Sequence, residues 1–206
     1  MNEQEQWLNW AVELQALAQA GMYYTKVEFE RERYERIREI SAEMLSLKTD
    51  IPVDKVKELF CAGSGYQTPK LDNRAVIFND DKILLVQESD GRWALPGGWQ
   101  DVNLSVKENT VKEVREEAGL EAVAERIIAV QDRDKNNPPP IAVKIVKIFV
   151  LCKAIGGSFQ PNSETLDSGY FGLDDLPVLS TSKTTEAQIK MCFEAYKDEN
   201  WVVRVD

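Results

Sequence analysis

The chain has 206 residues, of which 43% are hydrophobic and 29% charged, a balance typical of a globular protein with a sizeable core rather than of a disordered chain. Its 25 lysines and arginines are outnumbered by 35 aspartates and glutamates, and the net charge of −10 argues against nonspecific binding to nucleic acid or anionic lipid. The sequence contains no histidine, which excludes Ser-His-Asp and Cys-His catalysis and leaves acid–base or metal chemistry to carboxylates.

Residues 1–62 repeat apolar side chains at helical spacing and therefore predict three amphipathic helices. The charged run Glu28–Arg33 lies within the second of these helices and is interpreted as a solvent-exposed face. Together the helices define an expected N-terminal helical domain. The apolar positions that carry the prediction are Trp7, Trp10, Leu14, Leu17 and Ala18, then Ile37, Ile40, Met44 and Leu47, then Val56, Leu59 and Phe60.

Residues 63–70 contain glycines and a proline, break this periodicity and predict a linker. Beyond it the sequence changes to short runs rich in β-branched residues. Arg74–Phe78 and Ile83–Val86 are two such runs, and the Asn79–Lys82 stretch between them is typical of a hairpin turn. A second domain, residues 71–206, is therefore expected to begin with a β-hairpin.

The remainder of this second domain predicts further strands and a final helix. Strands are expected near Ala122–Gln131 and Ala142–Ala154, and the proline-rich polar loop Asp132–Pro140 between them is expected to be exposed. Thr184–Tyr196 returns to helical spacing. The combination predicts a mixed α/β domain.

One helix of this domain is predicted to begin after Ser105. The stretch Ser105-Val106-Lys107-Glu108 fits a capping box, in which the serine and glutamate side chains satisfy free backbone N–H groups at the start of a helix. Gly119 fits the left-handed residue that ends a helix. Glu108 therefore has a structural task as its simplest explanation.

Glu113, Glu116 and Glu117 lie at spacings i, i+3 and i+4 in that helix, so their carboxylates point to nearly one side. Each like-charged pair costs roughly 0.2–0.5 kcal/mol, and a bound cation would reverse this cost. Oxygen-only ligands suit Mg²⁺ or Mn²⁺, and the preceding Pro96-Gly97-Gly98 turn would let the backbone approach such a cation closely. A solvated acidic face and an ordinary glycine turn are the alternative interpretation.

At these residues the sequence resembles the Nudix hydrolase family, whose box reads Gly, five residues, Glu, seven residues, then Arg-Glu-aliphatic-x-Glu-Glu-x-Gly-aliphatic. Gly98 and the stretch Lys112-Glu113-Val114-Arg115-Glu116-Glu117-Ala118-Gly119-Leu120 match this box in the correct register. The resemblance extends from the preceding hairpin to Glu164 and to Tyr170–Pro177. It implies a Nudix α/β/α sandwich with a mixed sheet, here preceded by the small helical unit.

Two positions depart from the family box. Leu104 stands where the family has its first glutamate, and Lys112 stands where it has arginine. Because these two positions are usually ionic partners in the family, their joint replacement indicates one coupled change. The charge role at position 104 has moved to Asp101 or Glu108, or it is absent.

The resemblance implies a pyrophosphatase that uses Mg²⁺ (or Mn²⁺) to cleave a nucleoside diphosphate linked to a group X, releasing a nucleoside monophosphate and phospho-X. Glu113, Glu116 and Glu117 would hold the metal, with the Gly97 carbonyl as a further ligand. Glu116 and Glu117 would thereby be catalytic.

A general base and phosphate-binding cations are expected outside the box. In the family the base often lies in a separate loop, where Glu164 is the nearest match and Asp167 a weaker one, although an exposed loop glutamate is the alternative for Glu164. The substrate phosphates would be bound by Arg74, Arg92 and Arg133, with Lys135 as a further candidate, and each of these is otherwise a surface charge. Stacking on a nucleobase would fall to Tyr66, Trp93 or Trp99, the two tryptophans being equally well explained as core residues.

The N-terminal helical unit resembles, more loosely, the extension of a bacterial Nudix group that includes CDP-choline pyrophosphatase and proteins named ADP-ribose pyrophosphatase. The likeness depends on its length, the Trp-Leu-x-Trp-Ala pattern from Trp7 and the Ala-Gln-Ala-Gly-x-x-Tyr stretch ending at Tyr24. It implies CDP-choline, slightly ahead of ADP-ribose, as the substrate and a homodimer as the assembly. Two alternatives stay open: an RNA end-processing or exonuclease Nudix enzyme, which the acidic charge disfavours, and a Nudix-fold sensor that binds a nucleotide without cleaving it.

The cysteines and the first residues predict a cytoplasmic protein. Cys61, Cys152 and Cys192 are odd in number and show no CxxC spacing, so reduced thiols are expected rather than disulfides or a thiolate metal site. Polar and acidic residues surround Trp7 and Trp10 in place of the basic start and apolar run of a signal peptide. No stretch approaches about 18 uninterrupted apolar residues, and no membrane association is expected.

Overall fold

The computed structural model describes residues 3–206, with side chains described from Gln6 onward. Met1 and Asn2, with which the expected N-terminal domain begins, lie outside the described residues. Within the described part of the chain, no helix has both the length and the apolar composition needed to cross a membrane.

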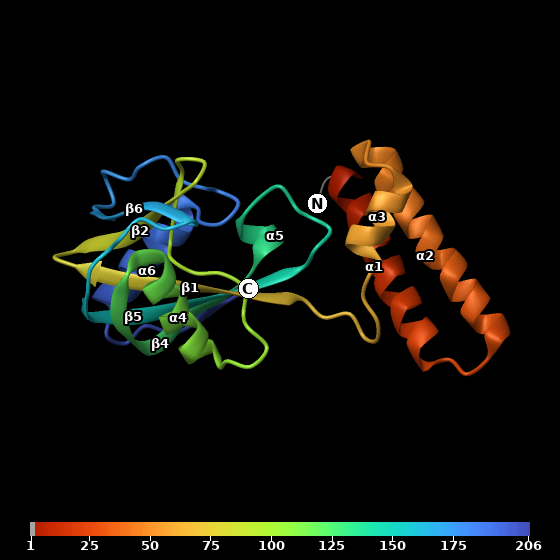
Figure 1. Cartoon of the computed structure of the whole chain (residues 1–206), viewed down its shortest axis with the longest axis horizontal. Coiled ribbons are helices and arrows are strands. Elements are labelled where there is room, and N and C mark those ends of the chain that lie inside the picture. Colours follow the sequence, from red (N-terminus) through yellow and green to blue (C-terminus); the bar gives the residue numbers. More distant parts are fainter. Residues whose placement is uncertain (1–2) are drawn as a thin grey trace. The chain divides into compact units, whose positions relative to one another are not determined.

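The described residues divide into two compact units (Figure 1). The first unit contains the described residues up to Pro69 together with Pro140–Lys144. The second contains Lys70–Pro139 and Ile145–Asp206. Each unit has a hydrophobic core of its own.

The first unit is helical, as the periodicity predicts. Its described residues form three helices, α1 (Glu3–Tyr24), α2 (Glu28–Thr49) and α3 (Val53–Phe60). The side chains that the helices bury against one another are small or aliphatic, which allows close packing. They are Leu8, Ala11, Val12, Ala42, Leu45, Val56 and Cys61.

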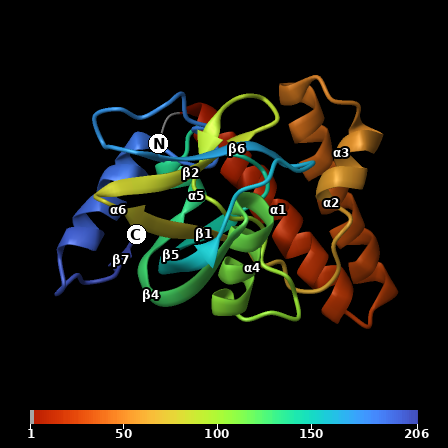
Figure 2. The ribbon, with the colours of Figure 1, turned by 60° about the vertical axis from the view of Figure 1, so that its left-hand side comes forward.

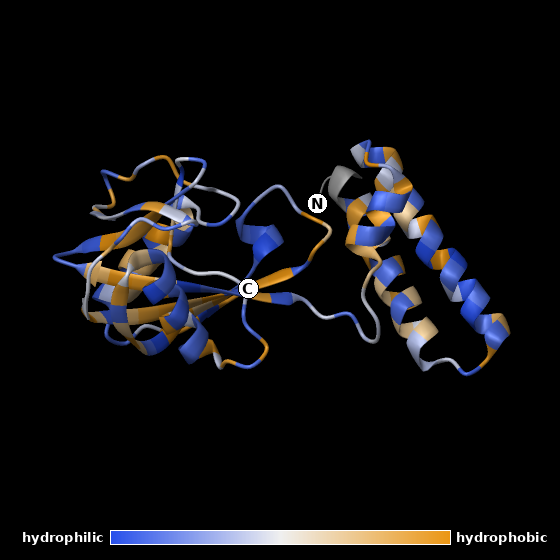
Figure 3. Cartoon of the chain, in the orientation of Figure 1, coloured by the Kyte–Doolittle hydropathy of each residue, from blue (hydrophilic) through white to orange (hydrophobic). Residues whose placement is uncertain are grey.

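Several apolar residues of the predicted helical stripes lie at the surface instead of in this core. Leu47 is 83% exposed, and Trp10, Leu17 and Leu59 are more than half exposed. α2 is largely hydrophilic along its length (Figure 3). The helical unit therefore presents several of its apolar stripe residues to its surroundings.

The segment Pro140–Lys144 belongs to the helical unit although it is far away in sequence. Ala142 packs against the helical core, and Lys144 Nζ donates a hydrogen bond to Asn9 Oδ1 at 3.2 Å. The sequence predicts a strand from Ala142, but the strand begins only at Ile145 because the preceding residues pack against the helices.

The second unit is built on a mixed sheet (Figure 2). Within the described residues its seven strands have the order β3-β2-β1-β5-β4-β7, and β6 pairs with β2. β1 runs parallel to β5, whereas β4 and β5 are antiparallel. The strands are β1 (Lys70–Asn79), β2 (Lys82–Glu88), β3 (Trp93–Ala94), β4 (Leu120–Asp132), β5 (Ile145–Gly157), β6 (Thr165–Phe171) and β7 (Arg204–Val205).

Helices cover both faces of this sheet. α4 (Val106–Ala118) and α6 (Glu186–Lys197) lie on opposite sides (Figure 2). Because successive strand residues point to opposite faces, Val76 of β1 packs on the α6 side while Ala75 and Ile77 pack on the α4 side. The second unit is therefore an α/β/α sandwich with a mixed sheet, preceded by helices, and the predicted fold class is confirmed.

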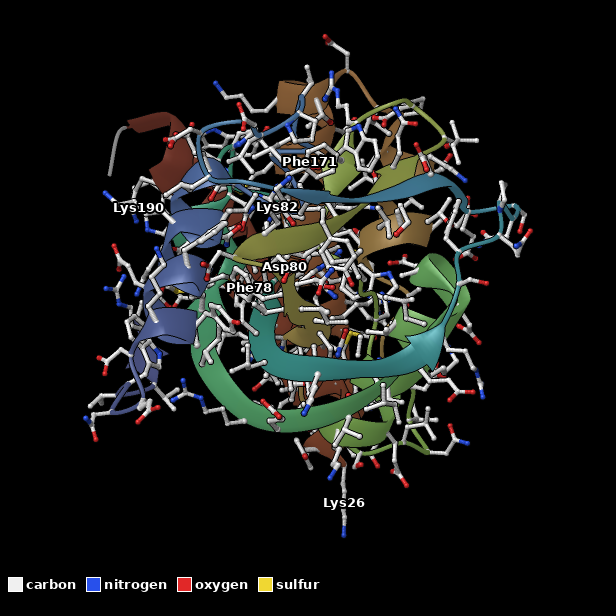
Figure 4. The ribbon with its side chains drawn as sticks, turned by 90° about the vertical axis from the view of Figure 1, so that its left-hand side faces the viewer. Lys26, Phe78, Asp80, Lys82, Phe171 and Lys190 are labelled. Carbon is white, nitrogen blue, oxygen red and sulfur yellow. The ribbon has the colours of Figure 1, made fainter. Side chains whose placement is uncertain are left out.

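The predicted hairpin joins β1 and β2. Phe78 pairs with Ile83, and both Asp80 and Asp81 adopt left-handed backbone conformations, with φ of 47° and 56°. Aspartate tolerates this region better than most residues, which explains the turn. Figure 4 shows Phe78 at this end of the sheet, where its ring stacks on Tyr196 of α6 with centroids 4.1 Å apart.

The proline-rich loop is less exposed than the sequence predicts. It begins with a short helix, α5 (Arg133–Asn136), and Asn137 is fully buried. Asn137 Nδ2 donates to Gln188 Oε1 at 3.1 Å, and Gln188 Nε2 donates back to Asn137 Oδ1 at 2.8 Å. Gln188 also completes a capping box with Thr185 at the start of α6, so one side chain holds the loop and the helix together.

Candidate active site

The Pro96–Gly98 segment occupies a strand position beside β1. β2 pairs with β1 only next to their turn, and further along β1 its backbone groups bond to this segment. Ala75 N donates to Pro96 O at 2.8 Å, and Asn73 N donates to Gly98 O at 2.9 Å. The loop is therefore fixed by a sheet ladder in place of β2.

The two glycines of this segment lie in close contact with their neighbours. Gly97 has φ of 144°, and a Cβ added there would lie 1.9 Å from Asn73 O. A Cβ on Gly98 would lie 2.8 Å from Glu113 Oε2. Glycine at these positions thus allows the loop backbone to fit between β1 and α4.

The capping box at the start of α4 is present in the structure. Ser105 N donates to Glu108 Oε2 at 2.8 Å, and Glu108 N donates to Ser105 Oγ at 3.3 Å. The hydrogen bonds from Ser105 lower the pKa of the Glu108 carboxyl. Gly119 ends the helix with φ of 65°. The structural role predicted for Glu108 is confirmed.

Two amide side chains that the sequence analysis missed hold the loop against α4. Asn109 is fully buried, accepts from Asp101 N at 3.0 Å and donates to Trp99 O at 3.0 Å. Gln100 Nε2 donates to Leu104 O at 2.6 Å. An asparagine inside a helix carries no sequence signal for this task, because its partners come from the preceding loop.

Glu113 and Glu117, one turn apart on α4, face the glycine segment. Glu113 is 8% exposed, and Glu117 Oε2 accepts a hydrogen bond from Gly97 N at 2.7 Å. Glu116 instead lies exposed on the outer side of the helix. The structure thus brings Glu117 to the Gly97 N–H and Glu113 against Gly98, and a ligand role for the Gly97 carbonyl stays a prediction.

Burial makes both inward carboxylates more difficult to ionise. It raises the pKa of Glu117 to about 7, although the Gly97 N–H, Arg74 and Lys183 each lower it. Burial also raises the pKa of Glu113, against the lowering effect of Lys112. Two partly buried carboxylates on one helix face therefore lack full cationic compensation, which is the electrostatic condition that a bound divalent cation would satisfy.

Lys112 contacts the outer side of this cluster. Its Nζ lies 2.9 Å from Glu116 Oε2, 3.3 Å from Glu113 Oε1 and 3.4 Å from Asp101 Oδ2. These carboxylates raise its pKa. Within residues 3–206 no three carboxylate or thiolate groups converge as a ready-made metal site, and Lys112 itself bridges two of the predicted ligands. The lysine's partner in the loop is Asp101, since Glu108 caps the helix.

We expect Lys112→Met to destabilise the metal-free protein by about 1 kcal/mol, because Glu113 and Glu116 would then repel each other without a shared cation. Asp101→Asn should cost less, since it removes one exposed ion pair and leaves the other two. Urea unfolding in EDTA measures both effects, and Lys107→Met, an exposed lysine of the same helix, is the matched control. A Lys112→Met variant no less stable than this control would contradict the bridging role.

The loop that carries Glu164 is attached to the C-terminal end of α4. Asn162 Nδ2 donates to Glu116 O at 2.9 Å, and Thr165 Oγ1 donates to Glu117 O at 2.9 Å. The exposed Glu164 lies between these anchors. Asp167, the weaker candidate, pairs with Gln87 in the β2–β6 ladder. The structure thus brings Glu164 to the helix end that bears Glu117.

Two of the three arginines predicted to bind phosphate are buried. Arg74 donates to both Asp72 carboxylate oxygens, at 3.1 and 2.7 Å, and to Leu95 O at 3.1 Å. Arg133 donates to the Pro139 carbonyl and pairs with Asp134. The alternative interpretation of these two arginines as surface charges is wrong, because both are buried and their N–H donors are bonded to protein groups. Their role toward phosphate stays a prediction.

The other predicted ligand-binding side chains lie nearer the surface. Arg92 is exposed in the turn between β2 and β3, with Nε 3.9 Å from Asp90 Oδ2, and Lys135 is exposed in α5. Trp93 packs in the core, with its ring 4.9 Å from that of Phe171. Trp99 is 53% exposed and has Lys70 Nζ 5.2 Å from its ring centroid, so a core role for Trp99 is wrong. Tyr66 is exposed in the first unit.

A buried ionic network beside the loop was not predicted. Lys147 is opposite Asp72 in the β1–β5 ladder, with Nζ 3.3 Å from Asp72 Oδ2, and it also donates to the Lys183 carbonyl. Burial lowers the pKa of Lys147 to about 8. The available signal was a lone lysine in an apolar strand, since such a charge requires a buried partner.

The α/β/α fold and the helix that carries Glu113 and Glu117 are both typical of one protein family, and comparison with family models identifies it. The model of the NUDIX domain matches residues 69–191, and a model described as "UDP-X-like, N-terminal oligomerisation domain" matches residues 5–60. Since the first model covers more than half of the sequence, the chain belongs to the Nudix family.

Three relatives indicate its activity class. A Bacillus subtilis (strain 168) protein, YjhB, provisionally named as an ADP-ribose pyrophosphatase, is 38% identical over 192 residues, which are 93% of this chain and 92% of that protein. The crystal structure of an ADP-ribose pyrophosphatase from Streptococcus suis 89-1591 is 57% identical, covers 68% of this chain and 100% of its own, and has a TM-score of 0.64. The crystal structure of a UDP-X diphosphatase is 35% identical, covers 98% of both chains and has a TM-score of 0.65. The protein is a Nudix pyrophosphatase, a hydrolase that acts on a diphosphate linkage.

Proposed function

We propose that the protein hydrolyses ADP-ribose, or a nucleoside diphosphate linked to another group X, to a nucleoside monophosphate and phospho-X in a reaction that requires Mg²⁺ or Mn²⁺. The observation that carries the proposal is the pair of inward carboxylates, buried Glu113 and half-buried Glu117, facing the Pro96–Gly98 segment. An acidic helix face that served only solubility would have no reason to turn two carboxylates inward against a glycine loop.

The donor set fits a hard divalent cation. Glu113 and Glu117 offer carboxylate oxygens in a partly dehydrated site, and Glu116 lies on the same two turns of α4. We assign these three residues, with the Gly97 carbonyl, to metal binding. When bound, such a cation neutralises the charge that develops on the phosphate oxygens during hydrolysis.

The residues around the metal site have separate tasks. Glu164, held at the end of α4 by its neighbours Asn162 and Thr165, is proposed to accept a proton from the attacking water. Arg74 favours the ionised form of Glu117, since its guanidinium lowers the pKa of that carboxyl. Glu116 and Glu117 would thus contribute to catalysis as ligands, and Glu164 as the base.

The relatives change the preferred order of substrates. The sequence alone places CDP-choline slightly ahead, but the B. subtilis and S. suis relatives are both named for ADP-ribose. The match of the N-terminal model and of the UDP-X diphosphatase structure supports a UDP-linked compound as a second candidate. We therefore place ADP-ribose first, a UDP-linked substrate second and CDP-choline third.

The helical unit is proposed to mediate homodimer formation, as its matched model is described as an oligomerisation domain. Exposed apolar side chains in this unit support an interface, because such groups are covered when copies associate. These include Trp10, Leu17, Tyr23, Tyr24, Phe29, Leu47 and Leu59.

A cytoplasmic setting is supported by the three cysteines, all buried with free thiols.

The proposal predicts metal-dependent cleavage of one or two compounds in a panel of ADP-ribose, UDP-glucose, CDP-choline, diadenosine polyphosphates, dNTPs and short RNA. Each is incubated with Mg²⁺, Mn²⁺ or EDTA, and the released nucleoside monophosphate and phosphate ester are measured. We expect cleavage of ADP-ribose with Mg²⁺ and none with EDTA. Cleavage of RNA alone would favour the end-processing enzyme, and binding without cleavage of any compound would favour the sensor.

A further inference from the structure

A nucleoside diphosphate brings negative charge to a site that already contains two partly buried carboxylates, so a cation within reach of the substrate is needed. Arg74 and Arg133, two of the cations predicted for this purpose, are engaged with protein groups in the interior. Lys183, in contrast, is partly exposed to solvent. It belongs to no motif of the family box, and its side chain is 46% exposed.

The backbone of Lys183 is fixed next to the glycine segment. Its turn is anchored on the strand that leads into Pro96, because Ser180 N donates to Trp93 O at 2.8 Å and Leu95 N donates to Thr184 Oγ1 at 3.1 Å. From the interior, Lys147 Nζ donates to the Lys183 carbonyl. A residue held in this way can direct a flexible ammonium toward one place.

The Lys183 side chain extends toward the site from this anchor. It pairs with Glu88, the last residue of β2, whose side chain is 19% exposed. Glu88 is opposite Thr165, and Thr165 Oγ1 is bonded to the carbonyl of Glu117. The Lys183–Glu88 pair therefore lies at the end of β2 that adjoins the Glu164 loop and the C-terminal end of α4.

We propose that Lys183 is a substrate-binding residue that contacts the diphosphate of the nucleotide, exchanging its ion pair with Glu88 for phosphate oxygens. The inference rests on the proposed function for the identity of the ligand. A lysine ammonium suits this task because it has three donors and binds phosphate as a point charge. Lys147, with Asp72 and Arg74 behind it, is the positioning group for the Lys183 backbone.

The test is steady-state kinetics of ADP-ribose hydrolysis with Lys183→Met. Removing a charge-assisted contact should raise KM by about 10-fold or more, while kcat changes less because the contact exists before and during reaction. Lys183→Arg should recover most of the affinity. Lys190→Met, an exposed lysine of α6 that points away from the sheet (Figure 4), is the matched control and should behave as wild type.

A purely structural ion pair between Lys183 and Glu88 makes a different prediction. In that case Glu88→Gln would raise KM as much as Lys183→Met does. If Lys183 instead binds the diphosphate directly, Glu88→Gln leaves the ammonium available, and KM in this variant is no higher than in wild type. Urea unfolding of both variants reports any loss of stability. An unchanged KM in Lys183→Met, or an equal rise in Glu88→Gln, overturns the proposal.

Calorimetric binding of ADP-ribose in EDTA separates this inference from the hydrolase assignment. If the wild type binds ADP-ribose without cleaving it and Lys183→Met binds it about 10-fold more weakly, the Lys183 assignment stands while hydrolysis fails. If the wild type cleaves ADP-ribose and Lys183→Met matches it in KM and in binding, hydrolysis stands and the Lys183 assignment fails. If the wild type neither binds nor cleaves any compound of the panel, both the hydrolase assignment and the Lys183 assignment fail.

Discussion

Glu117→Gln is expected to lower turnover by about 10²-fold or more, because it removes the charge of a proposed metal ligand and leaves the packing of α4 intact. The amide oxygen of glutamine can still accept the hydrogen bond from Gly97 N, which is 2.7 Å from the present carboxylate. Glutamine also fills nearly the same volume. The substitution therefore separates the charge of the residue from its contacts.

The same substitution should stabilise the metal-free protein at neutral and alkaline pH. The Glu117 carboxyl has an ordinary pKa of 4.5, and burial raises it to about 7 in the folded chain. Between these values the folded state binds more protons than the unfolded state, so stability falls as pH rises from 4.5 to 7. Above pH 7 the folded protein carries the full free-energy cost of ionising Glu117. The pKa shift limits this loss of stability to about 3 kcal/mol. Glutamine has no such cost.

Urea unfolding in EDTA at pH 5 and at pH 8 measures this effect. Glu117→Gln should be more stable than wild type at pH 8, and the difference should be much smaller at pH 5. Glu125→Gln, which removes an exposed carboxylate of β4, is the matched control and should change neither stability nor turnover. Adding Mg²⁺ should stabilise wild type more than Glu117→Gln. Near-wild-type turnover in the variant would rule out a metal-ligand role for Glu117.

The helix that bears the box could be predicted because its signals are local. Ser105 and Glu108 satisfy each other's backbone N–H groups within one turn, and Gly119 stops the helix through its own left-handed conformation. The hairpin before it depends in the same way on Asp80 and Asp81. None of these features requires a partner from a distant part of the chain.

The burial of charged residues could not be predicted in this way. Whether Arg74 lies at the surface is decided by Asp72 and the Leu95 carbonyl, and Arg133 is held by the carbonyl of Pro139. Lys183 reaches the site only because tertiary contacts place its turn beside β3. A sequence states that such residues are charged, but the partners that bury or expose them are fixed by the fold.

The replacement of two box positions is explained by the same reasoning. A glutamate at position 104 is not needed for an ion pair with the lysine at position 112, because Asp101 already lies 3.4 Å from Lys112 Nζ. Asp101 is in turn held by its backbone N–H, which donates to the buried Asn109. The sequence leaves Asp101, Glu108 or no residue for this role, and the structure places Asp101 beside Lys112 while Glu108 caps the helix at Ser105.

Gly97→Ala is expected to lower the free energy of unfolding more than a Gly→Ala substitution at a turn position where an added Cβ has open space. The added Cβ would lie 1.9 Å from Asn73 O, whereas an ordinary contact begins near 3.4 Å, so the backbone of the loop or of β1 must move. Its φ of 144° adds strain for a residue with a side chain. We expect a loss of about 3 kcal/mol or more.

Gly91→Ala isolates the conformational part of this cost. Gly91 also has a left-handed backbone, with φ of 82°, but the nearest atom to an added Cβ is Gln87 Nε2 at 4.0 Å. Its substitution should cost about 1–2 kcal/mol and leave turnover unchanged. Gly97→Ala should in addition lower turnover by about 10²-fold, because a shift of about 1 Å would displace the loop from Glu117. Equal losses of stability in the two variants, with normal turnover in both, would show that the contact between Gly97 and β1 does not set the position of the inward carboxylates.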